Sequence, residues 1–355
     1  MKQSIRRYSG NPILKPEDVV PSGIEMKVEG IFNCGAAKLG DDYLLLCRVA
    51  ESAIGNGDYL RLPVLSKETG YRDVSVESYR RDSPLYDFTD SRAIRLKGDH
   101  KTFRLTSLSH FRLARSSDGR NFCLDSEPCI FPEGVFEEWG IEDPRITEIG
   151  GIFYITYSSI SSNGVTASLI STTDFRTYSR HGVILPPTNK DAALFPAKIR
   201  EKYWILHRPA PSDIGGMNIW IAHSDNITDW GGHKMIYAPN KDDEWESSRV
   251  GVGPSPVLTE RGWLVMYHGV DKNSVYSAGL LLLDSDEPSK VLAKTKRPFF
   301  SPEAAYEKDG FFPDVIFPCG LISVESGLLI YYGATDNTIC LAETSWKNIW
   351  GALYE

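Results

Sequence analysis

The chain has 355 residues, of which 41% are hydrophobic and 24% charged, as is usual for a globular protein of one large domain or two smaller ones. Its net charge of −8 argues against nucleic acid or an anionic membrane as a partner, because both require a basic face. No apolar run is long enough to cross a bilayer, and the N-terminal segment lacks the apolar stretch of a signal peptide. We therefore expect a cytoplasmic protein.

Short apolar runs alternate with turn residues along the whole chain, which indicates an all-β fold. One pattern recurs five times: a polar residue or glycine, an apolar run, and a polar side chain. Its copies are DDYLLLCRV (41–49), GIFYITYSS (151–159), EKYWILHRP (201–209), RGWLVMYHG (261–269) and SGLLIYYGA (326–334). A second strand that ends in Ser or Asp follows four of them, as in FRLARSSDG (111–119) and ASLISTTDF (167–175).

The spacing of these copies favours one architecture. Where the pattern recurs regularly, the steps are about 50 to 65 residues, the size of a unit of a few strands in a repeat protein. We interpret the recurring run as the first strand of each unit and predict a five-bladed β-propeller. A pair of β-sandwiches is the alternative, but it leaves the repeat unexplained.

A propeller would also bring together polar residues that are distant in sequence. Arg48, Arg208 and His268 each follow the apolar run of their copy. Because the inner strands of a propeller line a central channel, these side chains would converge there. Singly, each is more often a surface charge or a structural histidine.

The segment WGIEDPRIT (139–147) places Glu142, Asp143, Pro144 and Arg145 at the start of an apolar strand. Alone, such a segment is more often a turn with a surface ion pair. Pro144 keeps Asp143 out of the α region and so fixes its direction. Together with the converging bases, this rigidity indicates a catalytic carboxylate in a cleft.

The six cysteines are scattered, and four lie within apolar, strand-like runs, which indicates reduced and buried thiols. Their spacing does not suggest a zinc site, so we expect no metal.

The motifs of the chain resemble those of glycoside hydrolase family 130, the inverting β-mannoside phosphorylases and their hydrolase relatives. The resemblance runs through FNCGAAKLGDDYLLLCRV, GIEDPRIT, NKDAALFPAKI, LHRP, GVGPSPV, GWLVMYHGV, DVIFPCG and YYGATDNTICLAE, and so covers nearly the whole chain. It implies a five-bladed propeller, here a single catalytic domain over residues 1–355. DSRAIRL and SLSHFRLARSSDG look most like the branch that acts on β-1,2-linked mannosides.

The resemblance also implies roles for individual residues. Asp143 matches the catalytic acid, which is proposed to protonate the glycosidic oxygen through a hydroxyl of the bound mannose. Asn33 and Asp336 match residues that hold the mannosyl ring. Four residues match positions that bind phosphate in the phosphorylases: Arg48, Lys198, His268 and Tyr276. Arg145 and Arg208 are basic candidates near them.

Two features of the sequence do not match these implied roles. Some phosphorylases carry an arginine between the EDPR strand and the following Ser-x-x-Asp-Phe turn, but residues 161–175 contain neither Arg nor Lys. The phosphate site would then be incomplete or built differently. A proton donor at neutral pH also needs a raised pKa, which the nearby Arg145 would oppose.

The function implied is that of an inverting β-mannoside phosphorylase, which needs one carboxylic acid and an anion site. It would use inorganic phosphate as co-substrate, without metal or other cofactor, and release α-mannose 1-phosphate. An inverting β-mannosidase instead needs a second carboxylate to activate water. That hydrolase and a non-catalytic sugar-binding propeller remain alternatives. The oligomeric state stays open, a homo-oligomer included.

Overall fold

Strands dominate the structure, a computed structural model that describes residues 4–98, 101–211, 213–240, 242 and 244–354. Two α-helices, α1 (Ala305–Lys308) and α2 (Trp346–Tyr354), and one 3₁₀ turn, η1 (Pro16–Asp18), are found in these residues. The all-β prediction is therefore confirmed. No helix among the described residues is long and apolar enough to span a bilayer.

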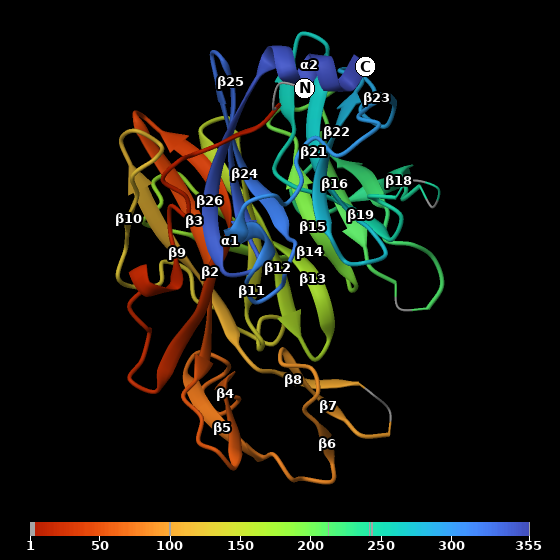
Figure 1. Ribbon diagram of the computed structural model, residues 1–355. Helices are drawn as coiled ribbons and strands as arrows, with labels where there is room; N and C mark the ends of the chain where they lie inside the picture. Colours follow the sequence, from red (N-terminus) through yellow and green to blue (C-terminus); the bar gives the residue numbers. More distant parts are fainter. Residues whose placement is uncertain (1–3, 99–100, 212, 241, 243, 355) are drawn as a thin grey trace.

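Five antiparallel sheets form the body of the molecule (Figure 1). The first contains β2 (Met26–Leu39), β3 (Asp42–Ala53), β9 (Leu108–Ser116) and β10 (Cys123–Leu124). The second contains β11 (Ile141–Ile149), β12 (Ile152–Ser161), β13 (Gly164–Thr172) and β14 (Ser179–Leu185). The third contains β15 (Asn189–Leu194), β16 (Tyr203–Pro209), β17 (Ile219–Ser224) and β18 (Gly231–Tyr237).

The last two sheets follow the same plan. The fourth contains β19 (Arg249–Val252), β21 (Gly262–Val270), β22 (Tyr276–Leu283) and β23 (Val291–Lys294), with β20 (Val257–Thr259) also paired to β21. The fifth contains β24 (Ile316–Val324), β25 (Gly327–Ala334), β26 (Thr338–Ser345) and β1 (Arg6–Arg7). Because β1 pairs with β26, the two ends of the chain meet in one sheet.

The five recurring runs of the sequence become β3, β12, β16, β21 and β25. Each is the second strand of its sheet, not the first as the sequence pattern suggested. The runs that end in Ser or Asp become the third strands. The recurring sequence pattern did not reveal the first strands. Register shifts interrupt four of them (β2, β11, β15 and β24) and break the alternation of apolar residues.

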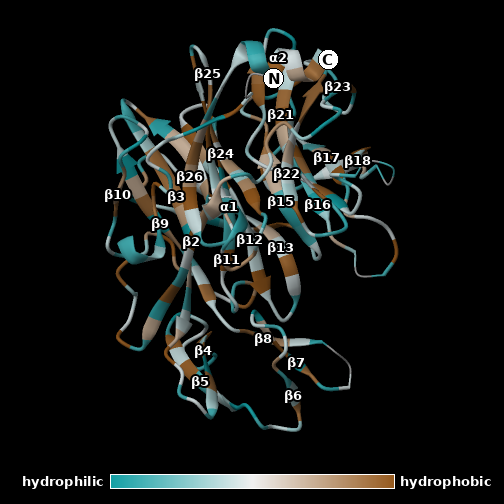
Figure 2. Ribbon diagram, viewed as in Figure 1, coloured by the Kyte–Doolittle hydropathy of each residue, from teal (hydrophilic) through white to brown (hydrophobic). Residues whose placement is uncertain are grey.

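Neighbouring sheets share apolar cores, and the alternation along one strand explains how. In β3, Leu44 and Leu46 pack toward the second sheet, whereas Leu45 and Cys47 pack toward the fifth. Similar clusters join the second sheet to the third, the third to the fourth and the fourth to the fifth. Figure 2 shows hydrophobic residues concentrated on these strands. All six cysteines are free thiols, and four of them are buried in or beside these cores.

The described residues between β3 and β9, 54–98 and 101–107, form an additional element that we call the arm (Figure 1, orange). Its strands are β4 (Tyr59–Leu65) and β5 (Val74–Arg80), which form a hairpin, and β6 (Tyr86–Asp87), β7 (Ala93–Leu96) and β8 (Thr102–Leu105), which form a small sheet. A separate apolar cluster around Leu62, Val64 and Ile94 holds it together. The sequence pattern did not predict this element.

Candidate active site

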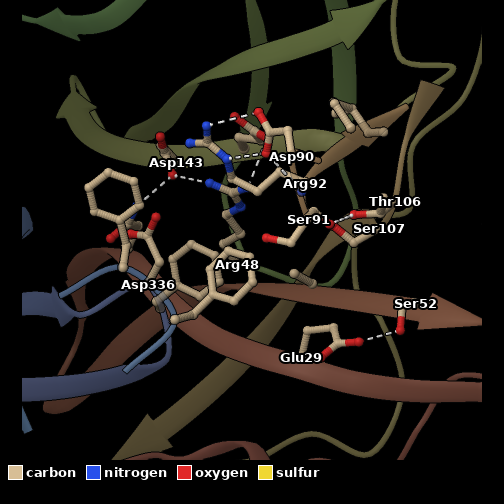
Figure 3. Close-up of a pocket in the computed structure, with 18 of the residues that line it drawn as sticks. Glu29, Arg48, Ser52, Asp90, Ser91, Arg92, Thr106, Ser107, Asp143 and Asp336 are labelled. Atoms are coloured by element: carbon tan, nitrogen blue, oxygen red, sulfur yellow. Dashed lines mark hydrogen bonds and ion pairs between the residues drawn. The ribbon is translucent and has the colours of Figure 1, made fainter. Parts of the chain in front are cut away.

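A cavity of about 700 Å³ lies between the body and the arm. Its volume is within the range usual for small-molecule sites. The body contributes polar side chains from different sheets, which we call the floor: Asn33, Arg48, Glu142, Asp143, Lys190, Asp191, Arg208, Arg249, His268, Tyr276 and Asp336. The arm contributes residues at the rim, among them Asp90 and Arg92 (Figure 3).

The same backbone conformation orients the side chains of three floor residues. Asn33, Asp143 and Asp191 have φ angles of 48°, 54° and 54°, in the left-handed region. Each lies at a register shift in the first strand of its sheet. A bulge of this kind turns a side chain away from the regular alternation, and Asn and Asp tolerate the conformation better than most residues. The same backbone feature therefore aims an amide or a carboxylate at the cavity from three sheets.

Asp143 is buried, with 6% of its surface exposed. Its Oδ1 accepts hydrogen bonds from Asn33 Nδ2 at 2.9 Å and from Arg48 Nη1 at 3.0 Å. Burial acts to raise the pKa of Asp143, but the charges of Arg48, Lys190 and Arg145 outweigh it and the pKa is lowered. Asp143 therefore does not have the raised pKa that a proton donor needs.

Glu142, the residue before Asp143, links two bases of the floor. Its Oε1 accepts a hydrogen bond from Arg48 Nη2 at 2.8 Å, and its Oε2 accepts one from Lys190 Nζ at 3.3 Å. Arg48 also donates from Nε to Ser109 Oγ at 3.1 Å. These bonds hold the guanidinium of Arg48 in a fixed orientation beside Asp143.

Asp191 is the centre of a second cluster of bases. Its Oδ1 accepts from Arg145 Nη2 at 3.0 Å, its Oδ2 accepts from Arg208 Nε at 2.5 Å, and His268 Nε2 lies 3.6 Å from Oδ2. Burial opposes ionisation, but the positive charges of Arg208 and Arg145 keep the pKa of Asp191 far below its usual range. A Cβ atom on Gly251 would lie 2.3 Å from Asp191 Oδ2, so this close packing requires glycine there.

His268 carries no formal charge near pH 7. Burial lowers the pKa of His268 to about 3, and the charges of Arg208, Arg145 and Arg249 add to this effect against that of Asp191. The imidazole is therefore neutral. The guanidinium of Arg249 donates a hydrogen bond to the Tyr276 hydroxyl and lies 5.1 Å from the centre of its ring.

Asp336 lies in the turn between β25 and β26 and also has a left-handed backbone, with φ of 52°. Burial raises its pKa to about 6, although Arg48 opposes the shift, and the negative charges of Asp143 and Glu142 raise it further. Two carboxyl groups that face one cavity thus have pKa values shifted in opposite directions, which is typical of a functional site.

The structure brings together seven of the nine site residues predicted from the sequence. Asn33, Arg48, Asp143, Arg208, His268, Tyr276 and Asp336 all line the cavity.

The other two predicted residues are placed elsewhere. Arg145 is buried beneath the cavity, where it donates to Asp191, to the Asp143 carbonyl at 3.2 Å and to the Gly253 carbonyl at 2.7 Å. Lys198 is exposed, with Nζ 4.5 Å from the centre of the Tyr203 ring. Neither contributes to the cavity lining, because protein acceptors occupy the donors of Arg145 and Lys198 is on the surface.

Sequence reasoning missed Lys190, Asp191 and Arg249, and it left Glu142 without a role. Lys190 is eight residues before Lys198 and points into the cavity instead of it. A signal for Asp191 was available, because FNCG, EDPR and KDAA each place an Asn or Asp at the bulge of a first strand. No group of three or more His, Cys, Asp or Glu side chains in the described residues is arranged to hold a metal ion.

Comparisons with known proteins agree on a family. A family model described as beta-1,4-mannooligosaccharide phosphorylase matches residues 97–355. A "Beta-1,2-mannobiose phosphorylase" of Listeria innocua is 41% identical over 338 residues, which cover 95% of this chain and 94% of that protein. A "1,2-beta-oligomannan phosphorylase" of Thermoanaerobacter sp. is 40% identical over 245 residues, which cover 68% of this chain and 80% of that protein.

A solved structure gives the same result. The Listeria innocua beta-1,2-mannobiose phosphorylase, in complex with beta-1,2-mannobiose, superposes with a TM-score of 0.94 at 39% identity. The match covers 99% of each chain. The chain therefore belongs to glycoside hydrolase family 130.

Proposed function

We propose that this protein is an inverting β-mannoside phosphorylase that acts on β-1,2-mannobiose or short β-1,2-mannosides. It transfers the mannosyl group to inorganic phosphate, and releases α-mannose 1-phosphate and a shortened sugar. The observation that carries the proposal is the position of the Asp143 carboxylate beside a cluster of bases at the bottom of the cavity.

The cluster, which we call the cradle, combines fixed charge with neutral donors. Arg48, Lys190, Arg208 and Arg249 supply positive charge, and His268 and Tyr276 supply hydrogen-bond donors. Arg and Lys form charge-assisted hydrogen bonds with phosphate oxygens, and the planar guanidinium suits two of them at once. Bound phosphate is itself nucleophilic, so such a site needs no general base.

Asp143 is the proposed acid. Phosphate attacks the anomeric carbon from the cradle side, the bond to the leaving sugar breaks, and its electrons pass to the glycosidic oxygen. That oxygen takes its proton from Asp143 through a mannose hydroxyl. Because the negative charge of phosphate offsets the charges of Arg48 and Lys190, which lower the pKa of Asp143, phosphate binding raises that pKa.

Asn33 and Asp336 are the proposed partners of the mannosyl ring. Asn33 already donates to Asp143, so a ring held by Asn33 lies beside the acid. The amide and the carboxyl group offer both donors and acceptors to sugar hydroxyls.

The linkage is proposed from the relatives. The two at 40% identity or more described above are named for β-1,2-linked substrates, whereas the description of the family model names β-1,4-linked ones. The relative with the more complete coverage is named for the disaccharide. We therefore favour β-1,2-mannobiose.

The arrangement gives little support to a hydrolase. An inverting hydrolase needs a second carboxylate free to take a proton from water. The floor has three further carboxyl groups. Glu142 and Asp191 each accept hydrogen bonds from two bases and so hold the cradle in place. The third, Asp336, is the proposed partner of the mannosyl ring.

We further propose that the five sheets are the blades of a five-bladed β-propeller forming a single domain. The proposal is supported by the cyclic order in which the sheets share apolar cores, including the fifth with the first, and by the pairing of β1 with β26. The free cysteines support a location in a reducing compartment such as the cytoplasm.

The test is to incubate the purified protein with β-1,2- and β-1,4-mannobiose, with and without phosphate. We expect α-mannose 1-phosphate only when phosphate is present, and faster turnover of the β-1,2 isomer. Equal release of free mannose at zero and at saturating phosphate would show a hydrolase. Binding of mannobiose without turnover under any condition would show a sugar-binding protein.

A further inference from the structure

The arm borders the active-site cavity, yet most of it lies outside the region that the family model matches. The match begins at residue 97, whereas the arm comprises residues 54–98 and 101–107. The arm nevertheless supplies the cavity rim with Arg61, Asp90 and Arg92, among other residues. It is therefore a part of the site that the common family pattern does not account for.

Arg92 is held in a defined orientation at this rim. Its Nε donates to Asp90 Oδ1 at 3.1 Å and its Nη2 donates to Asp90 Oδ2 at 3.2 Å. Asp90 also accepts from Arg95 Nη2 at 3.1 Å and from the backbone N–H of Arg92 at 3.0 Å. No protein acceptor for Arg92 Nη1 is found among the described residues, and 55% of the side chain is exposed.

Arg92 also lies close to an aromatic residue that the body contributes to the cavity lining. Its guanidinium lies 5.7 Å from the centre of the Phe312 ring, in the segment before β24. Phe312 in turn packs edge-on against Tyr276, with ring centres 6.2 Å apart. Phe311, the next residue toward the N-terminus, is half exposed and also lines the cavity. Arg92 and the two phenylalanines thus form an arginine-and-aromatic surface at the mouth.

The chemistry of inversion indicates which sugar this surface would meet. In a single displacement, phosphate and the leaving sugar lie on opposite sides of the anomeric carbon. The deepest cradle residues, Arg208 and His268, are 8% and 1% exposed, so phosphate lies at the bottom. The leaving sugar therefore projects toward the mouth, where planar guanidinium groups and aromatic faces suit sugar hydroxyls and ring faces respectively.

We propose that Arg92, oriented by Asp90 and packed on Phe312, is a specificity-determining residue that binds the leaving sugar. In the synthetic direction this sugar is the acceptor. The proposal rests on the proposed phosphorylase activity and adds the arm as the acceptor-binding part of the site.

The synthetic reaction separates the two sugars, because α-mannose 1-phosphate is the donor and mannose the acceptor. We expect Arg92→Ala to raise the KM for mannose roughly tenfold or more, the loss that one charge-assisted hydrogen bond produces. The KM for α-mannose 1-phosphate should change less than about threefold. Asp90→Asn should raise the mannose KM by a smaller factor, because Arg92 keeps its charge but loses its orientation.

Arg80→Ala is the matched control. Arg80 lies on the same arm and forms a similar two-point pair with Asp82, at 3.0 and 2.6 Å, but it does not line the cavity. It should leave both KM values unchanged. An unchanged mannose KM in Arg92→Ala would overturn the proposal, as would a rise confined to the KM for α-mannose 1-phosphate. A wild-type protein without phosphorolysis would instead refute the proposed function itself.

Discussion

The floor of the cavity and the arm above it are built in different ways. The floor joins residues from different sheets, and its carboxylates Asp143 and Asp191 are buried and held by several bases. The arm rests on a small apolar cluster, and its Arg92 is more than half exposed. Fixed groups suit bond breaking, since they need little rearrangement in the transition state. Exposed groups on a peripheral element suit the choice of substrate, because they can change without disturbing the floor.

The largest effect is expected at the centre of the floor. Asp143→Asn removes the proposed proton donor, and loss of a general acid typically costs about 10²–10⁴-fold in rate. Sugar binding and the fold should survive, because Asn tolerates the left-handed backbone at this position. Steady-state kinetics with β-1,2-mannobiose and phosphate provide the measurement. A variant that keeps more than about a tenth of the wild-type kcat would contradict the assignment.

Asp191→Asn should disturb the floor without removing the acid. Breaking a buried ion pair by removing one partner typically costs about 3–5 kcal/mol of stability, because the remaining charges stay buried. Here those charges are Arg145 and Arg208. We expect a clearly lower free energy of unfolding in denaturant titration and a raised KM for phosphate.

Asp225→Asn is the control for Asp191→Asn. Asp225 pairs with Lys202 on the surface, where its side chain is 83% exposed. Such a pair contributes at most about 1 kcal/mol. Equal destabilisation by the two changes would show that Asp191 does not organise the floor.

We expect the arm to unfold locally while the body stays folded. Leu62→Ala empties part of the small cluster and should cost roughly 2–3 kcal/mol locally, at the low end for a buried leucine because a peripheral site can relax. Hydrogen exchange should then quicken in β4 and β5 while β12 keeps its protection. Equal loss of protection in β12 would show that arm and body unfold as one unit.

His268→Ala should separate phosphate from sugar within the floor. Loss of one hydrogen bond to a charged group costs roughly 1.5–3 kcal/mol, or about 10–150-fold in affinity. The KM for phosphate should rise by such a factor, and the KM for mannobiose much less. His181→Ala is the control, since His181 is exposed and bonds Ser171 away from the cavity. Equal rises in both KM values would argue against a phosphate ligand.

The smallest effect concerns pH and Asp336. Its pKa in the folded protein, about 6, lies above the ordinary value of 3.8. The contribution of Asp336 to stability is therefore fully present below about pH 4 and is lost as the pH rises through about 6. The Asp336→Asn variant has no such carboxyl group to ionise. The difference between its Tm and that of the wild type should therefore increase in favour of the variant as the pH rises from 5 to 8. A Tm difference that is constant over this range would contradict the raised pKa.

The sequence predicted the repeated part of the fold well, because buried strands keep a regular apolar pattern. The runs around Leu45, Ile155 and Val265 are strands in the structure as expected. The arm could not be predicted in the same way, since β6, β7 and β8 are short and the partly exposed residues of β5 show no clear alternation of buried and exposed positions.

The sequence predicted the position of some residues of the site but not of others. Asp143 and His268 stand beside recognisable motifs and both line the cavity. The family resemblance implied that Lys198 binds phosphate, but Lys190 lines the cavity instead, next to the bulge at Asp191. The pKa of Asp143 depends on charges from three strands, β3, β11 and β15, so no local pattern could reveal it.

The central claim is that one acid and a phosphate cradle perform a single inverting displacement. It is tested most directly by following the reaction of β-1,2-mannobiose and phosphate by ¹H and ³¹P NMR from its first turnovers. The account predicts that α-mannose 1-phosphate appears first, together with an equal amount of mannose. β-Mannose 1-phosphate as the first product, or free mannose without a phosphorylated sugar, would contradict it.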